Sequence, residues 1–244
     1  MFLMENMKKN IASDTQILAV IKTDGYGHGG IPIARHIESL EFLYGFAVAT
    51  AEEAFELREA GVTKPILVLS YTFPYAYERL IREEIRITVF RKDTLQDLRK
   101  ASEKVGKTAS VHIKVDTGMG RIGIQPNEEG EMFVKAALET KGVYVEGIYT
   151  HFACADEEDL TSAKAQIQKF TGFTQKVEEK LSYRIPIHHS SNSAGILALP
   201  EANMNLVRAG ITMYGLLPSP EMAKTQVPLK PVLSLHSHIV YVKE

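Results

Sequence analysis

Residues 43–69 read LYGFAVATAEEAFELREAGVTKPILVL, and this stretch alternates two kinds of pattern. Leu43–Val48 and Pro65–Leu69 are short apolar runs, which predict buried strands. Between them, Thr50–Ala60 has the spacing of an amphipathic helix, and Gly61 follows as a helix C-cap. The stretch therefore predicts a strand–helix–strand unit, from which parallel sheets are built.

The same alternation continues over most of the chain. Further helical patterns cover Lys92–Val105, Glu128–Glu139 and Asp159–Leu181, the last with Asp159 as its expected N-cap. Eight strands, most followed by a helix, favour an α/β fold of the (β/α)8 TIM-barrel type, with a doubly wound open sheet as the alternative. The predicted strands are Ile17–Lys22, Leu43–Val48, Pro65–Leu69, Ile87–Phe90, Ser110–Val115, Val143–Thr150, Ile185–Ser190 and Asn205–Arg208.

The pattern changes near Gly215, so we divide the chain into three parts. Residues 1–215 would form the barrel, and residues 216–230, which contain three prolines, would form a linker. Residues 231–244 alternate apolar and polar side chains over Val232–Val242, as a half-buried strand does. Because a single strand leaves its backbone unpaired, we expect a truncation after the first strand of a C-terminal β-domain.

Composition narrows the class of protein. Of 244 residues, 45% are hydrophobic and 24% are charged, and the net charge is −2, which gives no sign of a nucleic-acid partner. Cys154 is the single cysteine, which excludes an intrachain disulfide and fits a reducing compartment. The sequence contains neither a signal-peptide pattern nor a long apolar run. We therefore expect a cytoplasmic protein with no membrane partner.

Lys22 closes the first predicted strand and is the first candidate for chemistry. In such barrels the active site forms at the carboxyl ends of the strands. A lysine at this mouth is partly desolvated, which favours its neutral amine and its condensation with an aldehyde. A glycine-rich turn carrying Tyr26 and His28 follows it.

Other candidates follow later strands. Lys114 is predicted on one strand face, with Val111, Ile113 and Val115 on the other, and Arg121 lies in the next loop. His151 ends another strand. The remaining strand histidines, His112, His188 and His189, are expected to be structural, and the histidines lack the spacing of metal ligands, so no metal is expected.

Two segments near the end of the barrel predict an anion site. Ser190–Ala194 would open a helix, and Arg208–Ile211 offers a guanidinium followed by a glycine. The loops after the seventh and eighth strands are the usual phosphate site of these barrels. A phosphate site and a lysine able to form an imine, at one barrel mouth, suit pyridoxal 5'-phosphate.

Five blocks of sequence resemble the alanine racemase family, in the family's order. They are AVIKTDGYGHGG from Ala19, KVDTGMGRIGI from Lys114, YTHFACADE from Tyr149, NSAGILALP from Asn192 and VRAGITMYGLLPS from Val207. The resemblance runs from about residue 6 to residue 244. Thr23, often alanine in the family, and Ala209, at a variable position, are the departures, and neither is a reactive group.

The resemblance implies roles for ten residues. Lys22 would hold the cofactor as a Schiff base and act as one catalytic base. Arg208 would donate to the pyridine nitrogen, and His151 would orient it. Arg121 would bind the substrate carboxylate, and Lys114 matches a lysine that is carbamylated in many members. The implied cofactor-binding residues are Lys22, Tyr26, His151, Asn192, Ser193, Arg208, Gly210 and Ile211.

The resemblance also implies a two-base isomerase that interconverts L- and D-alanine, a peptidoglycan precursor. In the family the second base is a tyrosine from the β-domain of the neighbouring subunit of a homodimer, and no tyrosine here lies in the matching motif. We therefore expect little or no racemase activity from this polypeptide alone. The alternatives are a single-domain pyridoxal-phosphate-binding homeostasis protein, a racemase of another amino acid, and a non-catalytic barrel that acts as a binding module.

Overall fold

The computed structural model describes residues 1–224 and 227–244 and forms a nearly closed barrel of eight parallel strands. The hydrogen-bonded strand order is β7-β6-β5-β4-β3-β2-β1-β8. At the remaining seam, the Arg208 N–H donates to the Ser191 carbonyl over 3.0 Å. This closure confirms the predicted barrel against an open sheet. The strands are β1 (Gln16–Val20), β2 (Leu43–Val48), β3 (Ile66–Val68), β4 (Arg86–Val89), β5 (Ala109–Lys114), β6 (Val143–Tyr149), β7 (Ile187–His189) and β8 (Leu206–Ala209).

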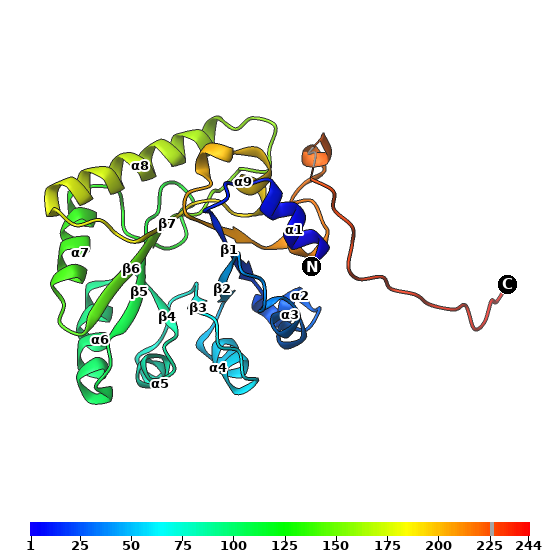
Figure 1. Ribbon diagram of the computed structural model, residues 1–244. Coiled ribbons are helices and arrows are strands. Elements are labelled where there is room, and N and C mark those ends of the chain that lie inside the picture. The colour runs from blue at the N-terminus through cyan, green and yellow to red at the C-terminus, as the bar shows by residue number, and fades with distance from the viewer. Residues whose placement is uncertain (225–226) are drawn as a thin grey trace.

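Helices follow the strands and lie outside the barrel (Figure 1). The α-helices are α1 (Phe2–Lys9), α2 (Lys22–Tyr26), α3 (Gly30–Ile37), α4 (Ala51–Glu59), α5 (Tyr77–Arg82), α6 (Lys92–Val105), α7 (Glu128–Glu139), α8 (Thr161–Leu181) and α9 (Ser193–Ala198). Short 3-10 turns are η1 (Pro74–Ala76), η2 (Pro200–Ala202), η3 (Ile211–Tyr214) and η4 (Pro220–Lys224). The predicted N-cap of α8 is one residue out: Leu160 is the N-cap, while the Asp159 carboxylate accepts from the Thr161 N–H over 2.9 Å.

A capping box begins α4. The Thr50 hydroxyl accepts from the Glu53 N–H, and the Glu53 carboxylate accepts from the Thr50 N–H in return. The same carboxylate also accepts from the Ala49 N–H over 2.7 Å and from the Thr23 N–H over 2.6 Å. Because Thr23 lies in the turn after β1, this one side chain ties two neighbouring turns at the barrel mouth.

The strands alternate their side chains between the helices and the barrel interior. One face of β5 packs against the helices, as expected: it carries Val111 and Ile113, and Val115 directly after the strand continues it. Lys114 is buried on the other face. The interior is divided in two. Near β1–β3 it is apolar, with Leu18, Val20, Ala47, Leu67 and Leu206 in one cluster. Near β4–β8 it is polar, with hydrogen-bonded side chains from Arg86, Thr88, His112, Glu146, Tyr149, His189 and Arg208.

Residues 234–244 run away from the barrel (Figure 1). Within the described residues no strand follows β8, and Leu235 and Val240 are 97% and 93% exposed. The Val232 N–H still donates to the Tyr214 carbonyl over 3.2 Å. The first strand of a C-terminal β-domain, and the division into barrel and linker, remain predictions. No helix in the described ranges is both long and apolar enough to cross a membrane.

Candidate functional site

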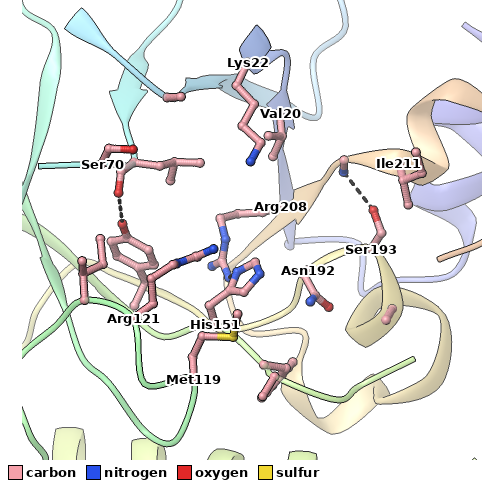
Figure 2. Close-up of a pocket in the computed structure, with 18 of the residues that line it drawn as sticks. Val20, Lys22, Ser70, Met119, Arg121, His151, Asn192, Ser193, Arg208 and Ile211 are labelled. Carbon is pink, nitrogen blue, oxygen red and sulfur yellow. Dashed lines mark hydrogen bonds between the residues drawn. The ribbon is translucent and has the colours of Figure 1, made fainter. Parts of the chain in front are cut away.

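A cavity of about 490 Å³ opens at the carboxyl ends of the strands. It is lined by all ten residues for which the sequence predicted a role, of which Figure 2 labels Lys22, Arg121, His151, Asn192, Ser193, Arg208 and Ile211. These residues are Lys22, Tyr26, Lys114, Arg121, His151, Asn192, Ser193, Arg208, Gly210 and Ile211. The ends of β5 and β8 and the loops after β1, β5, β6, β7 and β8 supply them, because parallel strands of a barrel end at the same rim.

Lys22 lies in a turn that the sequence did not predict. The predicted first strand included Lys22, but β1 ends at Val20 and Lys22 begins α2. Thr23 and Asp24 then adopt left-handed backbone conformations with φ of 55° and 49°. Such a conformation costs an L-residue about 1–2 kcal/mol, so the surrounding bonds must hold the turn. Figure 2 shows the Lys22 side chain reaching into the cavity toward Arg208.

Two bonds hold this left-handed turn from outside. The Glu53 carboxylate accepts from the Thr23 N–H, and the Asp24 carboxylate accepts from the Gly30 N–H over 2.7 Å. The second bond joins the turn to the beginning of α3. The backbone next to Lys22 is therefore held by the helix that follows β2 as well as by its own strand.

Tyr26, Ser193 and Gly210 meet on one side of the cavity. The Gly210 N–H donates to the Ser193 hydroxyl oxygen over 2.9 Å. A Cβ added at Gly210 would lie 3.3 Å from the Tyr26 hydroxyl and 3.6 Å from that of Ser193. The glycine thus leaves a small space between two hydroxyls and a backbone N–H, all of which suit phosphate oxygens.

Asn192, rather than Ser193, caps α9. The Asn192 side-chain oxygen accepts from the Gly195 N–H over 3.0 Å, and Ser193 is the first residue of the helix. The cap leaves the Ser193 hydroxyl free to face Gly210 and Thr212, whose hydroxyl lies 3.1 Å away. The Ser193 hydroxyl is therefore available to the cavity and is not used as the helix cap.

Arg208 is buried in the barrel with four of its five N–H groups directed at protein acceptors. Nη1 donates to Nδ1 of His189 over 2.9 Å and to the His189 carbonyl over 3.2 Å. Nη2 donates to the carbonyls of Thr150 and Ser190 over 2.7 and 2.9 Å, with His151 Nδ1 at 3.3 Å. Among residues 1–224 and 227–244, the Nε–H has no such partner. One donor therefore remains for a ligand in the cavity.

Positive charge dominates the lining of the cavity. Lys22, Lys114, Arg121 and Arg208 line it, against the single carboxylate of Asp156. Burial, reinforced by the charges of Arg208 and Arg121, lowers the pKa of Lys114 to about 7. Such an excess of cations favours a ligand with anionic groups.

Burial also lowers the pKa values of two neighbouring groups, His151 and Arg208. Burial, reinforced by the charges of Arg208 and Lys114, lowers the pKa of His151 to about 2, so its ring is neutral and can accept from Arg208. Burial lowers the pKa of Arg208 itself to about 10, which leaves the guanidinium charged at neutral pH.

Sequence reasoning gave no role to Tyr149, which separates two cations of the site. Arg208 Cζ and Lys114 Nζ each lie 5.2 Å from its ring centroid, and its ring stacks on His189 at 4.6 Å. Its hydroxyl bonds to Thr88 at 2.9 Å. The alternation along β6 does not reveal it, because the pairing with β5 shifts register between Val145 and Gly147, so that Val145 and Ile148 both pack in the outer cluster and Tyr149 lies inside the barrel.

A family model described as "Alanine racemase, N-terminal domain" matches residues 4–218. The chain belongs to the alanine racemase family. It is 43% identical over 241 residues to an alanine racemase of Clostridium perfringens, and the match covers 98% of this chain and 62% of that protein. The alanine racemase of Halothermothrix orenii is 42% identical over 243 residues, with coverage of 100% and 63%.

Solved structures of alanine racemases have the same fold as this family member. The alanine racemase of Clostridium difficile 630, in complex with cycloserine, matches with a TM-score of 0.90 at 38% identity, over 94% of this chain and 63% of that one. A histidine racemase from Leuconostoc mesenteroides subsp. sake matches with a TM-score of 0.83 at 25% identity, over 94% and 61%. The chain spans about three fifths of the length of these relatives.

Proposed function

We propose that this chain is the pyridoxal 5'-phosphate-binding barrel of an amino-acid racemase, and that the whole protein interconverts L- and D-alanine. The observation that carries the proposal is the meeting, around one cavity, of the Lys22 amine, the Ser193–Gly210 cradle and the Arg208 Nε–H. The relatives named above as alanine racemases favour alanine as the substrate.

The residues fit this cofactor at both of its ends. The space at Gly210, which a Cβ would fill, would receive the phosphate from Ser193, Tyr26 and the N–H groups of Gly210 and Ile211. The Lys22 amine would condense with the aldehyde carbon, whose oxygen would leave as water. Asn192 and His151 would flank the ring, and the unpartnered Nε–H of Arg208 matches an acceptor such as the pyridine nitrogen.

When bound, pyridoxal phosphate makes the α-hydrogen of an amino acid acidic enough to be removed. The protein's own part is to hold groups and move protons. The Lys22 amine would take or return the proton at one face of the α-carbon, and Arg121 would hold the carboxylate. Because a guanidinium keeps its proton at neutral pH, Arg208 would donate a hydrogen bond to the ring without transferring that proton.

We propose that Lys114 is carbamylated. A pKa of about 7 leaves much of its amine neutral, and a neutral amine is the form that adds carbon dioxide. The carbamate would replace a cation with an anion next to Arg121 and Arg208, and so convert a repulsion into an attraction.

For the whole protein we propose a homodimer in which a tyrosine of the neighbouring subunit's β-domain is the second base. This completes a two-base reaction in which each base serves one face of the α-carbon. On this proposal residues 1–244 alone have little or no activity, and a rate from this polypeptide equal to that of the whole protein would contradict it.

The proposal is tested by adding pyridoxal phosphate, reducing with borohydride and locating the label by peptide mass spectrometry. We expect the label on the peptide containing Lys22, its loss in Lys22→Ala, and no change in Lys135→Ala, whose lysine is exposed. Label on surface lysines alone, or none, would contradict the proposal.

Two alternatives keep the cofactor but change the activity. A racemase of another amino acid has support in the match to a histidine racemase, at lower identity than the alanine racemases. A homeostasis protein would label at Lys22 and racemise nothing. Assays of the whole protein with alanine, serine and histidine separate these, because we expect the highest kcat/KM for alanine.

A further inference from the structure

A continuous line of hydrogen bonds crosses the barrel interior from Arg208 to Glu146. Arg208 Nη1 lies 2.9 Å from His189 Nδ1, and His189 Nε2 lies 2.9 Å from His112 Nδ1. His112 Nε2 lies 3.3 Å from Glu146 Oε2. At the far end, Arg86 donates two bonds to the Glu146 carboxylate, over 2.9 and 3.1 Å.

The chemistry at the two ends gives this line one direction. A guanidinium can only donate, so His189 Nδ1 must accept, and its proton must sit on Nε2. That Nε2–H then donates to His112 Nδ1, which places the proton of His112 on Nε2 as well. A carboxylate can only accept, so the His112 Nε2–H points at Glu146. Both rings are neutral and carry the same tautomer.

Both histidine rings are closely packed. Both histidine side chains are fully buried. A Cβ added at Gly147 would lie 2.5 Å from His112 Nδ1, and the Tyr149 ring stacks on His189 at an interplanar angle of 9°. Burial also lowers the pKa of both histidines, in agreement with neutral rings.

We propose that Glu146, His112 and His189 are positioning residues that orient the Arg208 guanidinium from the amino-terminal side of the barrel. The step to cofactor binding rests on the function proposed above. Glu146 and Arg208 require the same direction from opposite ends of the line, so His112 and His189 both keep their proton on Nε2, and His189 presents a lone pair to Nη1. With both Nη groups held in this way, the Nε–H faces the cavity in a single orientation.

The line is tested without cofactor by ¹⁵N NMR of the histidine rings, whose nitrogen shifts distinguish the two tautomers. We expect Nε2–H on both rings in the wild type. Oε2 of Glu146 accepts from both His112 Nε2 and Arg86 Nε, and Oε1 accepts from Arg86 Nη2. Glu146→Gln removes the charge and leaves one oxygen for these three donors, so the bond from His112 Nε2–H weakens. Because Arg208 keeps His189 Nδ1 as an acceptor, both rings keep the Nε2–H tautomer, and we expect the ring nitrogen shifts of His112, and through it of His189, to change although His189 does not touch residue 146.

A second pair in the molecule gives the matched control. His188 Nε2 lies 2.8 Å from Glu178 Oε1, but this pair has no bond to Arg208. Glu178→Gln should leave the His112 and His189 signals unchanged, and Glu146→Asp, which keeps a carboxylate, should keep them close to those of the wild type. An unchanged His189 signal in folded Glu146→Gln would overturn the proposal. If that variant does not fold, His112→Asn interrupts the line instead, and the same unchanged signal would overturn it.

Cofactor titration supplies the second readout. We expect Glu146→Gln to weaken pyridoxal phosphate binding about tenfold, and Glu178→Gln to leave it as in the wild type. Equal affinity in wild type and Glu146→Gln would overturn the positioning role. Failure of the wild type itself to bind would count against the proposed function, while the NMR result still decides whether the line exists.

Discussion

Acidification from pH 7.0 to 5.5 is expected to destabilise the fold through buried histidines at the site. The pKa of His151 is lowered to about 2 and that of His189 lies well below its ordinary value, in both cases through burial first and the Arg208 charge second. In the unfolded chain each would titrate near pH 6.5. As the pH falls below 6.5 the unfolded state therefore binds protons that the folded state refuses, and stability is lost.

The magnitude follows from this linkage. Each of the two histidines contributes about 1.3 kcal/mol between pH 7.0 and 5.5, so together they lower the free energy of unfolding by about 2.5 kcal/mol. His112 shifts in the same direction and adds to the loss. Carboxylates contribute little in this window because their unfolded pKa values lie near 4.

Urea unfolding followed by circular dichroism at the two pH values measures this loss. His151→Gln should shrink it by about half of the 2.5 kcal/mol, whereas His238→Gln, in the exposed tail, should leave it unchanged. A loss below about 1 kcal/mol in the wild type, or one insensitive to His151→Gln, would refute the assignment of neutral buried rings.

Three further predictions concern the cavity. Gly210→Ala should weaken pyridoxal phosphate binding about tenfold in a direct titration, because the new Cβ would occupy the space beside Tyr26. The urea midpoint should stay nearly unchanged. Equal affinity of wild type and variant would show that the phosphate does not bind next to Gly210. Glu53→Ala should lower the free energy of unfolding by about 1–3 kcal/mol and slow the borohydride-trapped labelling of Lys22, because the Thr23 N–H loses its acceptor. A labelling rate equal to that of the wild type would show that the turn at Thr23 does not depend on Glu53. Lys114→Met should abolish a ¹³C carbamate signal seen with labelled bicarbonate, and an unlabelled wild type would contradict carbamylation.

The eight strands could be predicted from the sequence because most of them are short, largely apolar runs between turn residues. The turn at Thr23 could not, since a β-branched residue at positive φ contradicts local preference and is held by Glu53 from another unit. The predicted residues gathered at one cavity because parallel strands share a rim. His112 and His189 were expected to be structural, and their line to Arg208 depends on packing across the barrel, which sequence periodicity does not record.

The seam between β7 and β8 has a consequence for biosynthesis. The last strand pairs with the first, and it carries Arg208, with Gly210 directly after it. A growing chain with only seven strands outside the ribosome would contain Lys22 but neither Arg208 nor Gly210. On the proposed function, pyridoxal phosphate would thus bind only after the final strand has left the ribosome. A fragment ending before residue 206 would have an open sheet and no complete cofactor site.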